Sequence, residues 1–299
     1  MSGCRFTNWK VSGWMSKTPL ANWNGQEMPL SEVRVSVLDR AFLFGDAVYE
    51  VIRVYNGKPF LFDDHFRRLK SSLQSLQIAA ESERIAERAL ATLASSHVSD
   101  GMIYVQVTRG EAPRTHHFPH PAVTPNELIY VKELIDPYQA KRRQGGRVLL
   151  IDDLRWKRCD IKSVNLLANC LGAEQAHAAG YDEAIFVSPN GTLVEGTHTS
   201  LFGVRQGTIL TAPLSQHLLP GITRRLILRL AAECGISLQE ASLQRDNLHE
   251  LEELFLTGTT LEILPVIQVD QLQIGAGTPG PVTQALQKAY RAVIEMECD

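Results

Sequence analysis

The spacing of apolar residues predicts two helices in the first third of the chain. Apolar side chains recur at steps of three and four over residues 63–76, as on one face of a helix. Asp63 and Asp64 suit its first turn, because carboxylates are favourable near a helix N-terminus. The same pattern over residues 82–96 predicts a second helix.

Short apolar runs bounded by turn residues predict strands around these helices. Residues 35–62 are typical of strands broken by glycine turns, with Asn56-Gly57 as a hairpin signal. Residues 102–110 predict a short buried strand, and 147–151 begin another. Strands and helices are mixed without strict alternation, which predicts an α/β chain of the α+β type rather than a doubly wound sheet.

One segment interrupts this pattern near the middle of the chain. Residues 138–146 follow Pro137 and hold a cluster of cations and two glycines, as a linker does. The length of 299 residues also suggests two domains. We therefore predict an N-terminal α/β domain at 1–137 and a C-terminal α/β domain at 147–299.

Composition narrows the classes of function. Hydrophobic residues make up 44% of the chain and the formal net charge is -3, with no block of like charges, which argues against nucleic-acid and membrane partners. No apolar run is long enough for a membrane span, and the N-terminus lacks a signal core. The scattered cysteines are typical of reduced thiols in the cytoplasm. They are Cys4, Cys159, Cys170, Cys234 and Cys298.

Lys162 has an unusual place for a lysine. Lys157 lies in a run of cations with Arg155 and Arg158, as on a solvated face, whereas Lys162 directly precedes a predicted apolar helix. Most lysines keep the ammonium in water. A lysine in a partly desolvated site instead has a lowered pKa and attacks carbonyls as the free amine. Lys162 is thus either a surface lysine or a candidate nucleophile.

The helix predicted after Lys162 has an apolar stripe and stops at Gly180. The stripe consists of Leu166, Leu167, Cys170, Leu171 and Ala173. Lys162 is therefore expected at a corner between a strand and a helix.

Glu195 stands at a predicted strand end, directly before Gly196. It is either a turn residue or, if Lys162 carries a pyridoxal ring, the carboxylate that keeps the pyridine nitrogen protonated. A protonated ring is the better electron sink for a carbanion.

Two segments predict a phosphate site. Gly221-Ile222-Thr223 opens an amphipathic helix, whose first backbone N–H groups form either a plain N-cap or an anion site. Gly258 and Thr259 end an apolar strand and are a second candidate, to which Arg68 would add a guanidinium.

The loop PRTHHFPHP carries a candidate carboxylate clamp, since Arg114 and His116 are spaced to point the same way from an extended chain. A metal site is not expected here, because neighbouring His116 and His117 face opposite sides and no carboxylate or thiolate accompanies them.

The GAGTPG run at 275–280 has the letters of the GxGxxG dinucleotide-binding motif. We do not expect it to bind a dinucleotide, because it contains a proline and leaves no room for a βαβ unit.

Together these motifs resemble those of fold-type IV (class IV) pyridoxal-phosphate aminotransferases, and among them those of D-amino acid aminotransferases. The resemblance runs from about Ala21 to the final helix, with many motifs in the same order: FGDAVYEVIRVYNG, HFRRLKSS, YVQVTRG, PRTHHFP, RWKRCDIKSVNLL, LVEGTHTSLFGV, PGITR and FLTGTT. It implies two α/β domains with pyridoxal 5′-phosphate (PLP) in the cleft between them. The implied reaction moves an amino group between D-amino acids of the D-alanine type and 2-oxo acids by a ping-pong mechanism.

The resemblance also implies a role for each candidate residue. Lys162 is the lysine that forms a Schiff base with PLP, and Glu195 is the partner of the pyridine nitrogen. The phosphate site comprises Arg68, Ile222, Thr223, Gly258 and Thr259. Tyr49 lies near the reacting carbon, and Val51 and His198 set the width of the substrate pocket. Arg114 and His116 trap the substrate carboxylate from the neighbouring subunit, so a homodimer is expected.

Three features depart from the family pattern. Gly258 stands where D-specific relatives have a serine, and Ser200 stands for the usual asparagine, with His198 on the same loop. About 20 residues precede the family's usual start. Branched-chain L-aminotransferases, (R)-amine transaminases, aminodeoxychorismate lyases and a non-enzymatic ligand-binding homologue remain as alternatives.

Overall fold

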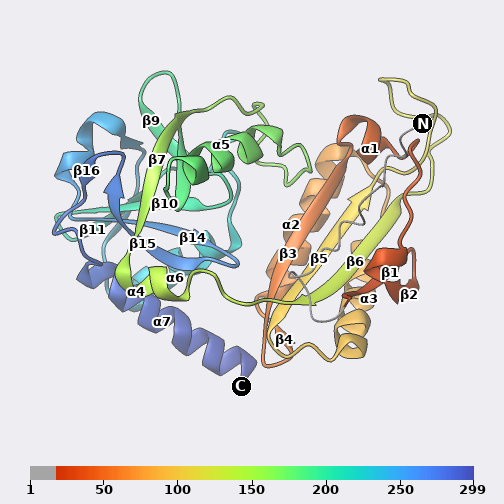
Figure 1. Ribbon diagram of the computed structural model, residues 1–299, viewed down its shortest axis with the longest axis horizontal. Helices are drawn as coiled ribbons and strands as arrows, with labels where there is room; N and C mark the ends of the chain where they lie inside the picture. The colour runs from red at the N-terminus through yellow and green to blue at the C-terminus, as the bar shows by residue number, and fades with distance from the viewer. Residues whose placement is uncertain (1–17) are drawn as a thin grey trace, which may run out of the picture.

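The structure is a computed structural model that describes residues 18–299. Cys4 and nearly all of the N-terminal extension lie outside the described residues. The chain forms two halves side by side, each built on one β-sheet (Figure 1). This arrangement agrees with the predicted two-domain α+β fold. The exact boundary at 137–147 stays a prediction.

The N-terminal half contains a six-stranded antiparallel sheet with the order β2-β1-β6-β5-β3-β4. Its elements are β1 (Leu20–Trp23), β2 (Gln26–Pro29), the 3-10 helix η1 (Leu30–Glu32), α1 (Arg40–Phe44), β3 (Ala47–Tyr55), β4 (Lys58–Pro59), α2 (Phe62–Leu76), α3 (Ser82–Ser96), β5 (Gly101–Thr108) and β6 (Asn126–Glu133). Helices α2 and α3 pack on the sheet around fully buried Ile52, Leu69 and Ile85.

Most predicted elements of this half are confirmed. The two periodic stretches form α2 and α3, and Asn56-Gly57 turns β3 into β4. The prediction of strands throughout 35–62 is wrong at Arg40–Phe44, which form α1. Asp39 accepts a 2.8 Å hydrogen bond from the Ala41 N–H at the start of this helix, and Gly45 ends it with a φ of 68°. These two caps outweigh the strand preference of the aromatic residues between them.

The C-terminal half contains a ten-stranded mixed sheet with the order β12-β11-β10-β14-β15-β7-β8-β9-β13, and β16 pairs with β15. Its elements are α4 (Gln139–Gln144), β7 (Gly146–Asp152), α5 (Leu167–Ala178), β8 (Glu183–Val187), β9 (Thr192–Gly196), β10 (Ser200–Arg205), β11 (Thr208–Thr211), α6 (Ile222–Glu233), β12 (Leu238–Glu240), β13 (Leu243–Gln244), the 3-10 helix η2 (Arg245–Glu250), β14 (Glu253–Gly258), β15 (Glu262–Val269), β16 (Leu272–Gln273) and α7 (Pro281–Cys298). Helix α4 falls within the segment predicted as a linker.

Helix α7 ties the two halves together. It packs on the C-terminal sheet and runs along the lower edge of Figure 1 toward β4. The Tyr290 ring meets Phe60 of the N-terminal half edge to face, with centroids 5.6 Å apart. At the end of the chain, Asn56 Nδ2 and Lys58 Nζ donate hydrogen bonds of 2.7 and 2.9 Å to Asp299. These contacts limit relative motion of the halves.

The predicted apolar stripe of α5 faces outward. Leu167 and Leu171 are 75% and 63% exposed, and the buried residues of this helix are Gly172 and Ala176. The small residues allow α5 to lie close on β7 and β8, since a Cβ atom at Gly172 would lie 2.4 Å from Ile151 Cδ1. Packing on the C-terminal sheet therefore does not use the larger apolar side chains of α5.

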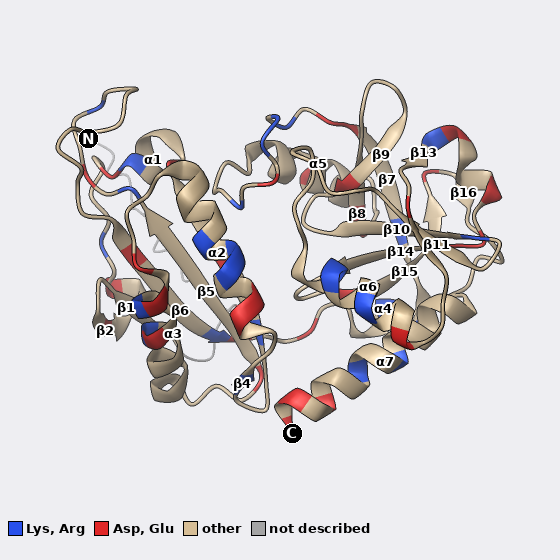
Figure 2. Cartoon of the chain, turned by 180° about the vertical axis from the view of Figure 1, so that it is seen from behind, with Lys and Arg blue, Asp and Glu red and all other residues tan. Residues whose placement is uncertain are grey.

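Charged side chains of both signs are interspersed over both halves (Figure 2). Across residues 18–299, no helix combines the length and apolar character needed to cross a membrane.

The core of the N-terminal half gives a test of the packing. We expect Leu69→Ala to lower the free energy of unfolding by about 2–5 kcal/mol, because it leaves a cavity beneath α2. Leu90→Ala is the control, since Leu90 is 43% exposed on α3, and it should change stability by no more than about 0.5 kcal/mol. Urea denaturation measures both. Equal effects would contradict the packing described for α2.

Candidate active site

A pocket lies between the two halves. Tyr49 of β3 and Arg68 of α2 line it from the N-terminal half, and the remaining lining residues come from the C-terminal half. The pocket brings together nine of the predicted site residues: Tyr49, Arg68, Lys162, Glu195, His198, Ile222, Thr223, Gly258 and Thr259.

The backbone around Lys162 continues the edge of the N-terminal sheet. The Tyr49 N–H donates to the Lys162 carbonyl (3.0 Å), and the Val164 N–H donates to the Ala47 carbonyl (3.1 Å). Ser163 thereby forms a β-bridge with Val48. A residue from the C-terminal half is thus held directly against β3, at the junction of the two sheets.

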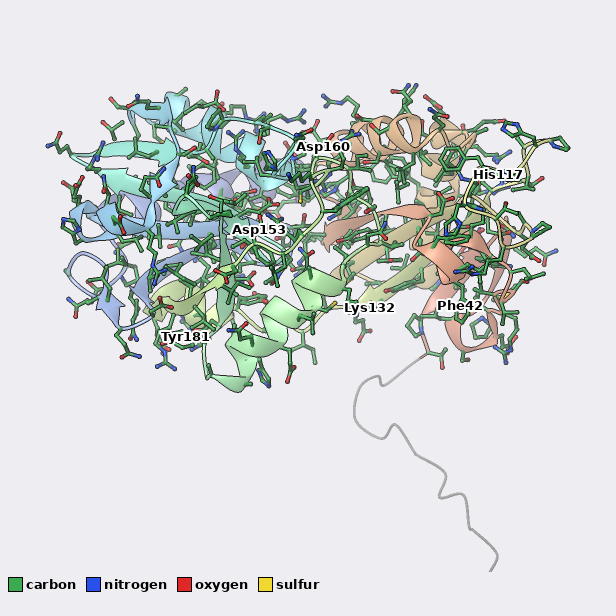
Figure 3. The ribbon with its side chains drawn as sticks, turned by 90° about the horizontal axis from the view of Figure 1, so that it is seen from above. Phe42, His117, Lys132, Asp153, Asp160 and Tyr181 are labelled. Carbon is green, nitrogen blue, oxygen red and sulfur yellow. The ribbon has the colours of Figure 1, made fainter. Side chains whose placement is uncertain are left out.

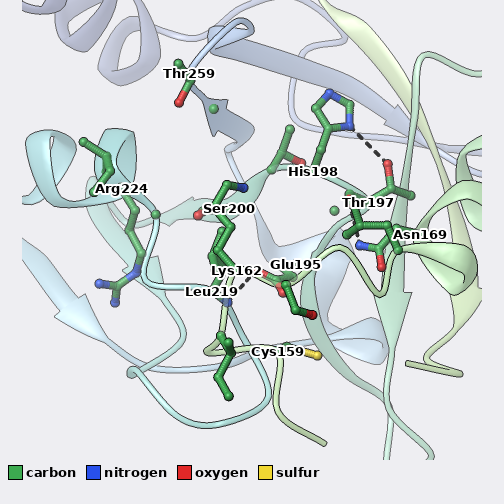
Figure 4. A pocket seen from close by; sticks show the side chains of 18 of the residues that line it. Cys159, Lys162, Asn169, Glu195, Thr197, His198, Ser200, Leu219, Arg224 and Thr259 are labelled. Atoms are coloured by element: carbon green, nitrogen blue, oxygen red, sulfur yellow. Dashed lines mark hydrogen bonds between the residues drawn. The ribbon is translucent and has the colours of Figure 1, made fainter. Parts of the chain in front are cut away.

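The side chain of Lys162 is half-buried and extends through the middle of the pocket (Figure 4). Its Nζ lies 4.1 Å from the centroid of the Tyr49 ring. Lys157, by contrast, is exposed. The two lysines therefore differ as the sequence suggested, and Lys162 has the partly desolvated setting that a nucleophilic amine needs.

Glu195 is the last residue but one of β9 and is almost completely buried. Arg155 forms an ion pair with Oε1. The Leu219 N–H donates a 3.0 Å hydrogen bond to Oε2 (Figure 4). Burial raises the pKa of Glu195 to about 7, although Arg155 and the Leu219 N–H oppose the rise. Arg155 is therefore what favours a charged carboxylate at this depth.

The interpretation of Arg155 as part of a solvated run is wrong. Its side chain is only 5% exposed and also pairs with Asp153, and its guanidinium lies 4.2 Å from the centroid of the Phe186 ring. Arg158 is 46% exposed and pairs with Asp160. Sequence spacing could not separate Arg155 from Arg158, because an irregular loop has no periodicity that assigns each residue a face.

The opposite end of the pocket offers hydrogen-bond donors to an anion. Within residues 18–299, no side chain caps the N-terminus of α6 at Gly221, so its first N–H groups stay available. In the same part of the chain, two buried atoms of the lining, Arg224 Nε and Thr257 Oγ1, lack hydrogen-bond partners. A phosphate accepts from such donors. These residues therefore fit a cofactor that carries a phosphate at one end.

Lack of space does not explain why glycine stands at position 258, where D-specific relatives have a serine. A Cβ atom there would lie 3.4 Å from the His198 carbonyl oxygen and farther from other atoms. These are ordinary contacts, so a small side chain would fit.

Arg68 is held by a buried carboxylate that the sequence did not single out. Its Nε and Nη2 donate to the two oxygens of Glu50 (2.7 and 2.9 Å), and Nη1 donates to the Pro220 carbonyl (3.1 Å). Burial opposes ionisation of Glu50, but Arg68 and His65 outweigh it and lower the pKa to about 2. The sequence did contain a signal for Glu50. It lies two positions from Val48 and from Ile52, so strand alternation places this charged residue on the core face of β3.

Three predicted site residues do not line the pocket of their own chain. Val51 is half-buried on β3 opposite Tyr104. Arg114 and His116 are exposed and lie near Phe44. The Arg114 guanidinium is 5.2 Å from the centroid of the Phe44 ring, and the centroids of the His116 and Phe44 rings are 5.7 Å apart. In Figure 3 the adjoining His117 is at the outer end of the N-terminal half, far from Asp153 and Asp160 on the loop that carries Arg155.

Known proteins share both the sequence and the fold. The profile of the family described as amino-transferase class IV matches residues 47–269. A D-alanine aminotransferase from Bacillus licheniformis is 39% identical over 277 residues, which cover 92% of this chain and 97% of that protein.

Solved structures give the same picture. A branched-chain amino acid aminotransferase from Escherichia coli superposes with a TM-score of 0.86 at 27% identity, over 95% of this chain and 97% of that one. A branched-chain amino acid aminotransferase from Thermobaculum terrenum, solved in its PLP form, has a TM-score of 0.81 at 26% identity, over 94% and 95% of the two chains. The pocket geometry, the family profile and these relatives confirm the predicted family: the chain belongs to the class IV aminotransferases.

Proposed function

We propose that this protein transfers an amino group between D-amino acids of the D-alanine type and 2-oxo acids, with PLP as cofactor and a ping-pong mechanism. The observation that carries the proposal is that Lys162 and Glu195 line one pocket with the open N-terminus of α6. The identity to a D-alanine aminotransferase over nearly the full length of both chains supports the substrate class.

The described residues suit the parts of PLP. Glu195 would hold the ring nitrogen, and the other end would be held by Arg68, Ile222, Thr223, Gly258 and Thr259. When bound, PLP supplies an electron sink that stabilises the negative charge left at the substrate Cα.

Lys162 Nζ would act as both base and acid. It would remove the proton from the substrate Cα and deliver it to the cofactor carbon on the other side of the amino nitrogen, so one amine would serve both steps. The Tyr49 ring, 4.1 Å from Nζ, restricts where this amine can swing. Glu195 contributes only when charged, and its pairing with Arg155 supports that state.

We further propose a homodimer in which Arg114 and His116 of one chain complete the pocket of the other. Two observations support it. The pair is exposed and does not line its own pocket. Large apolar side chains are also exposed, as at an interface: Val37 (65%), Phe42 (72%), Leu154 (80%), Leu167 (75%) and Leu171 (63%).

A cytoplasmic location is part of the proposal. It is supported by the cysteines of residues 18–299, namely Cys159, Cys170, Cys234 and Cys298, which are free thiols.

The chemistry is tested at Lys162. We expect Lys162→Ala to lose turnover of D-alanine with a 2-oxo acid by at least about 1,000-fold, because the only proposed base is removed. Borohydride should also attach no pyridoxyl group to position 162. Lys157→Ala, five residues away and exposed, is the control and should behave as the parent. The proposal fails if the parent protein binds no PLP or converts L-leucine but not D-alanine.

The pairing of Glu195 is tested with PLP affinity. We expect Arg155→Met to weaken PLP binding at pH 7 by roughly tenfold, ~1.4 kcal/mol. Without the guanidinium, the pKa of Glu195 rises further and the carboxyl is neutral at this pH. The deficit should shrink from about pH 7 to about pH 9, as the carboxyl ionises. Fluorescence titration of the apoenzyme measures this, with exposed Arg158→Met as control; equal affinities of the two variants would remove Arg155 from this role.

The shared site is tested by mixing two inactive variants. Lys162→Ala and Arg114→Ala, dissociated and reassociated together, should regain up to about a quarter of the parent activity, because half of the dimers are mixed and each mixed dimer holds one intact site. Each variant treated alone is the control. No recovery, in a mixture shown to exchange subunits, would place Arg114 outside the partner's pocket.

A further inference from the structure

His198 faces the pocket but has no part in the chemistry proposed above. It lies in the tight turn between β9 and β10, where the Gly196 N–H donates to the Thr199 carbonyl (2.8 Å). Only glycine fits at Gly196, since a Cβ atom there would lie 2.0 Å from Thr199 Oγ1. The turn therefore sets the position of the imidazole on the pocket wall (Figure 4).

A buried carboxylate fixes one side of this imidazole. Glu183 opens β8, its side chain is 1% exposed, and its oxygen lies 2.9 Å from His198 Nδ1. Glu183 also accepts hydrogen bonds from Thr197 Oγ1 (2.6 Å) and the Ala184 N–H (2.8 Å). With Glu183 as its acceptor, Nδ1 carries a hydrogen, and Nε2 is the nitrogen that lies near Tyr138.

The same contacts favour a charged imidazolium. Burial lowers the pKa of His198, and the Lys162 ammonium lowers it too, but the attraction of Glu183 outweighs both and raises it. Burial opposes ionisation of Glu183, yet His198 and Thr197 lower its pKa. Two hydroxyls also face the ring: that of Thr197, 3.1 Å from Nδ1, and that of Tyr138, 3.4 Å from Nε2.

The outer edge of the ring remains available to a substrate. The side chain is 46% exposed although its inner nitrogen is fixed. The contact to Tyr138 is longer than an ordinary hydrogen bond, so a better acceptor would replace it at little cost. A carboxylate is such an acceptor, because a charge-assisted bond is about twice as strong as a neutral one.

We propose that His198 recognises the side-chain carboxylate of dicarboxylic substrates, namely amino acids and 2-oxo acids with four or five carbons, through Nε2–H. Glu183 is its positioning residue. This inference rests on the proposed aminotransferase function and adds the residue that distinguishes an acidic substrate side chain from a methyl group.

The first test compares two substrates and two ligands. In the holoenzyme, His198→Ala should lower the ratio of kcat/KM for D-glutamate to that for D-alanine by about 10- to 100-fold, the effect of losing one bond between charged groups. Calorimetry should show a similar fall in the preference for glutarate over butyrate, which differ by one carboxylate. Unchanged ratios would overturn the role, and so would equal losses for both substrates, which would indicate contact with a group common to them.

This design separates the two proposals. Absence of D-alanine turnover by the parent protein contradicts the proposed function, whereas binding of glutarate and butyrate still measures what His198 does. A parent protein that turns over D-alanine but shows no preference for glutarate overturns the inference about His198 alone.

The role of Glu183 is tested by pH. Because Glu183 raises the pKa of His198, the preference for glutarate should be present at low pH and disappear as pH rises through that pKa. Glu183→Gln removes the attraction, so the preference should disappear at a lower pH. A midpoint that does not move would overturn the positioning role. Circular dichroism of the variant verifies that it is folded.

Discussion

The hydrogen bonds between β3 and residues 162–164 determine where the active site lies. They attach a segment of the C-terminal half to the edge of the N-terminal sheet, on the side of β3 that β5 does not occupy. Strand pairing fixes both the distance and the side on which each residue points. Lys162 is thereby placed beside Tyr49, and α7 links the two halves again at the opposite end of β3, where β4 pairs with it. A shift of the halves would move the amine away from the residues on β9 and α6.

The pocket also depends on buried carboxylates that each have a positive partner. Glu50 pairs with Arg68, Glu195 with Arg155, and Glu183 with His198. Burying one charge alone is expensive, and a close partner offsets much of that cost. The balance differs between sites: the pKa of Glu50 falls to about 2, whereas that of Glu195 rises to about 7. Glu195 is thus the one poised to respond to a further positive charge, such as a protonated ring nitrogen.

One chain supplies the residues expected to bind the cofactor but not those expected to bind the substrate α-carboxylate. Residues for the cofactor come from both halves of the same chain, but the predicted carboxylate trap does not reach the pocket. Arg114 and His116 instead lie beside Phe44, at the end of the molecule where Phe42 is 72% exposed. Substrate recognition would then combine a partner chain for the α-carboxylate with His198 for the side chain. This division separates what all substrates share from what differs between them.

The sequence alone determined helices α2 and α3, the motifs and the family. Periodicity placed α2 and α3 correctly, and the ordered motifs around Lys162 and Glu195 pointed to the class IV aminotransferases. It misread Arg155 as solvated, treated α1 as strand, and left Glu50 and Glu183 unnoticed. The error at α1 was local, since its caps Asp39 and Gly45 are adjacent to it in sequence. Tertiary structure decided the charged residues, because their burial and pairing depend on partners 15 to 40 positions away in sequence, such as Glu183 with His198 and Arg155 with Glu195. Helix periodicity and backbone propensity depend on residues a few positions apart. They therefore contain no information about such distant partners.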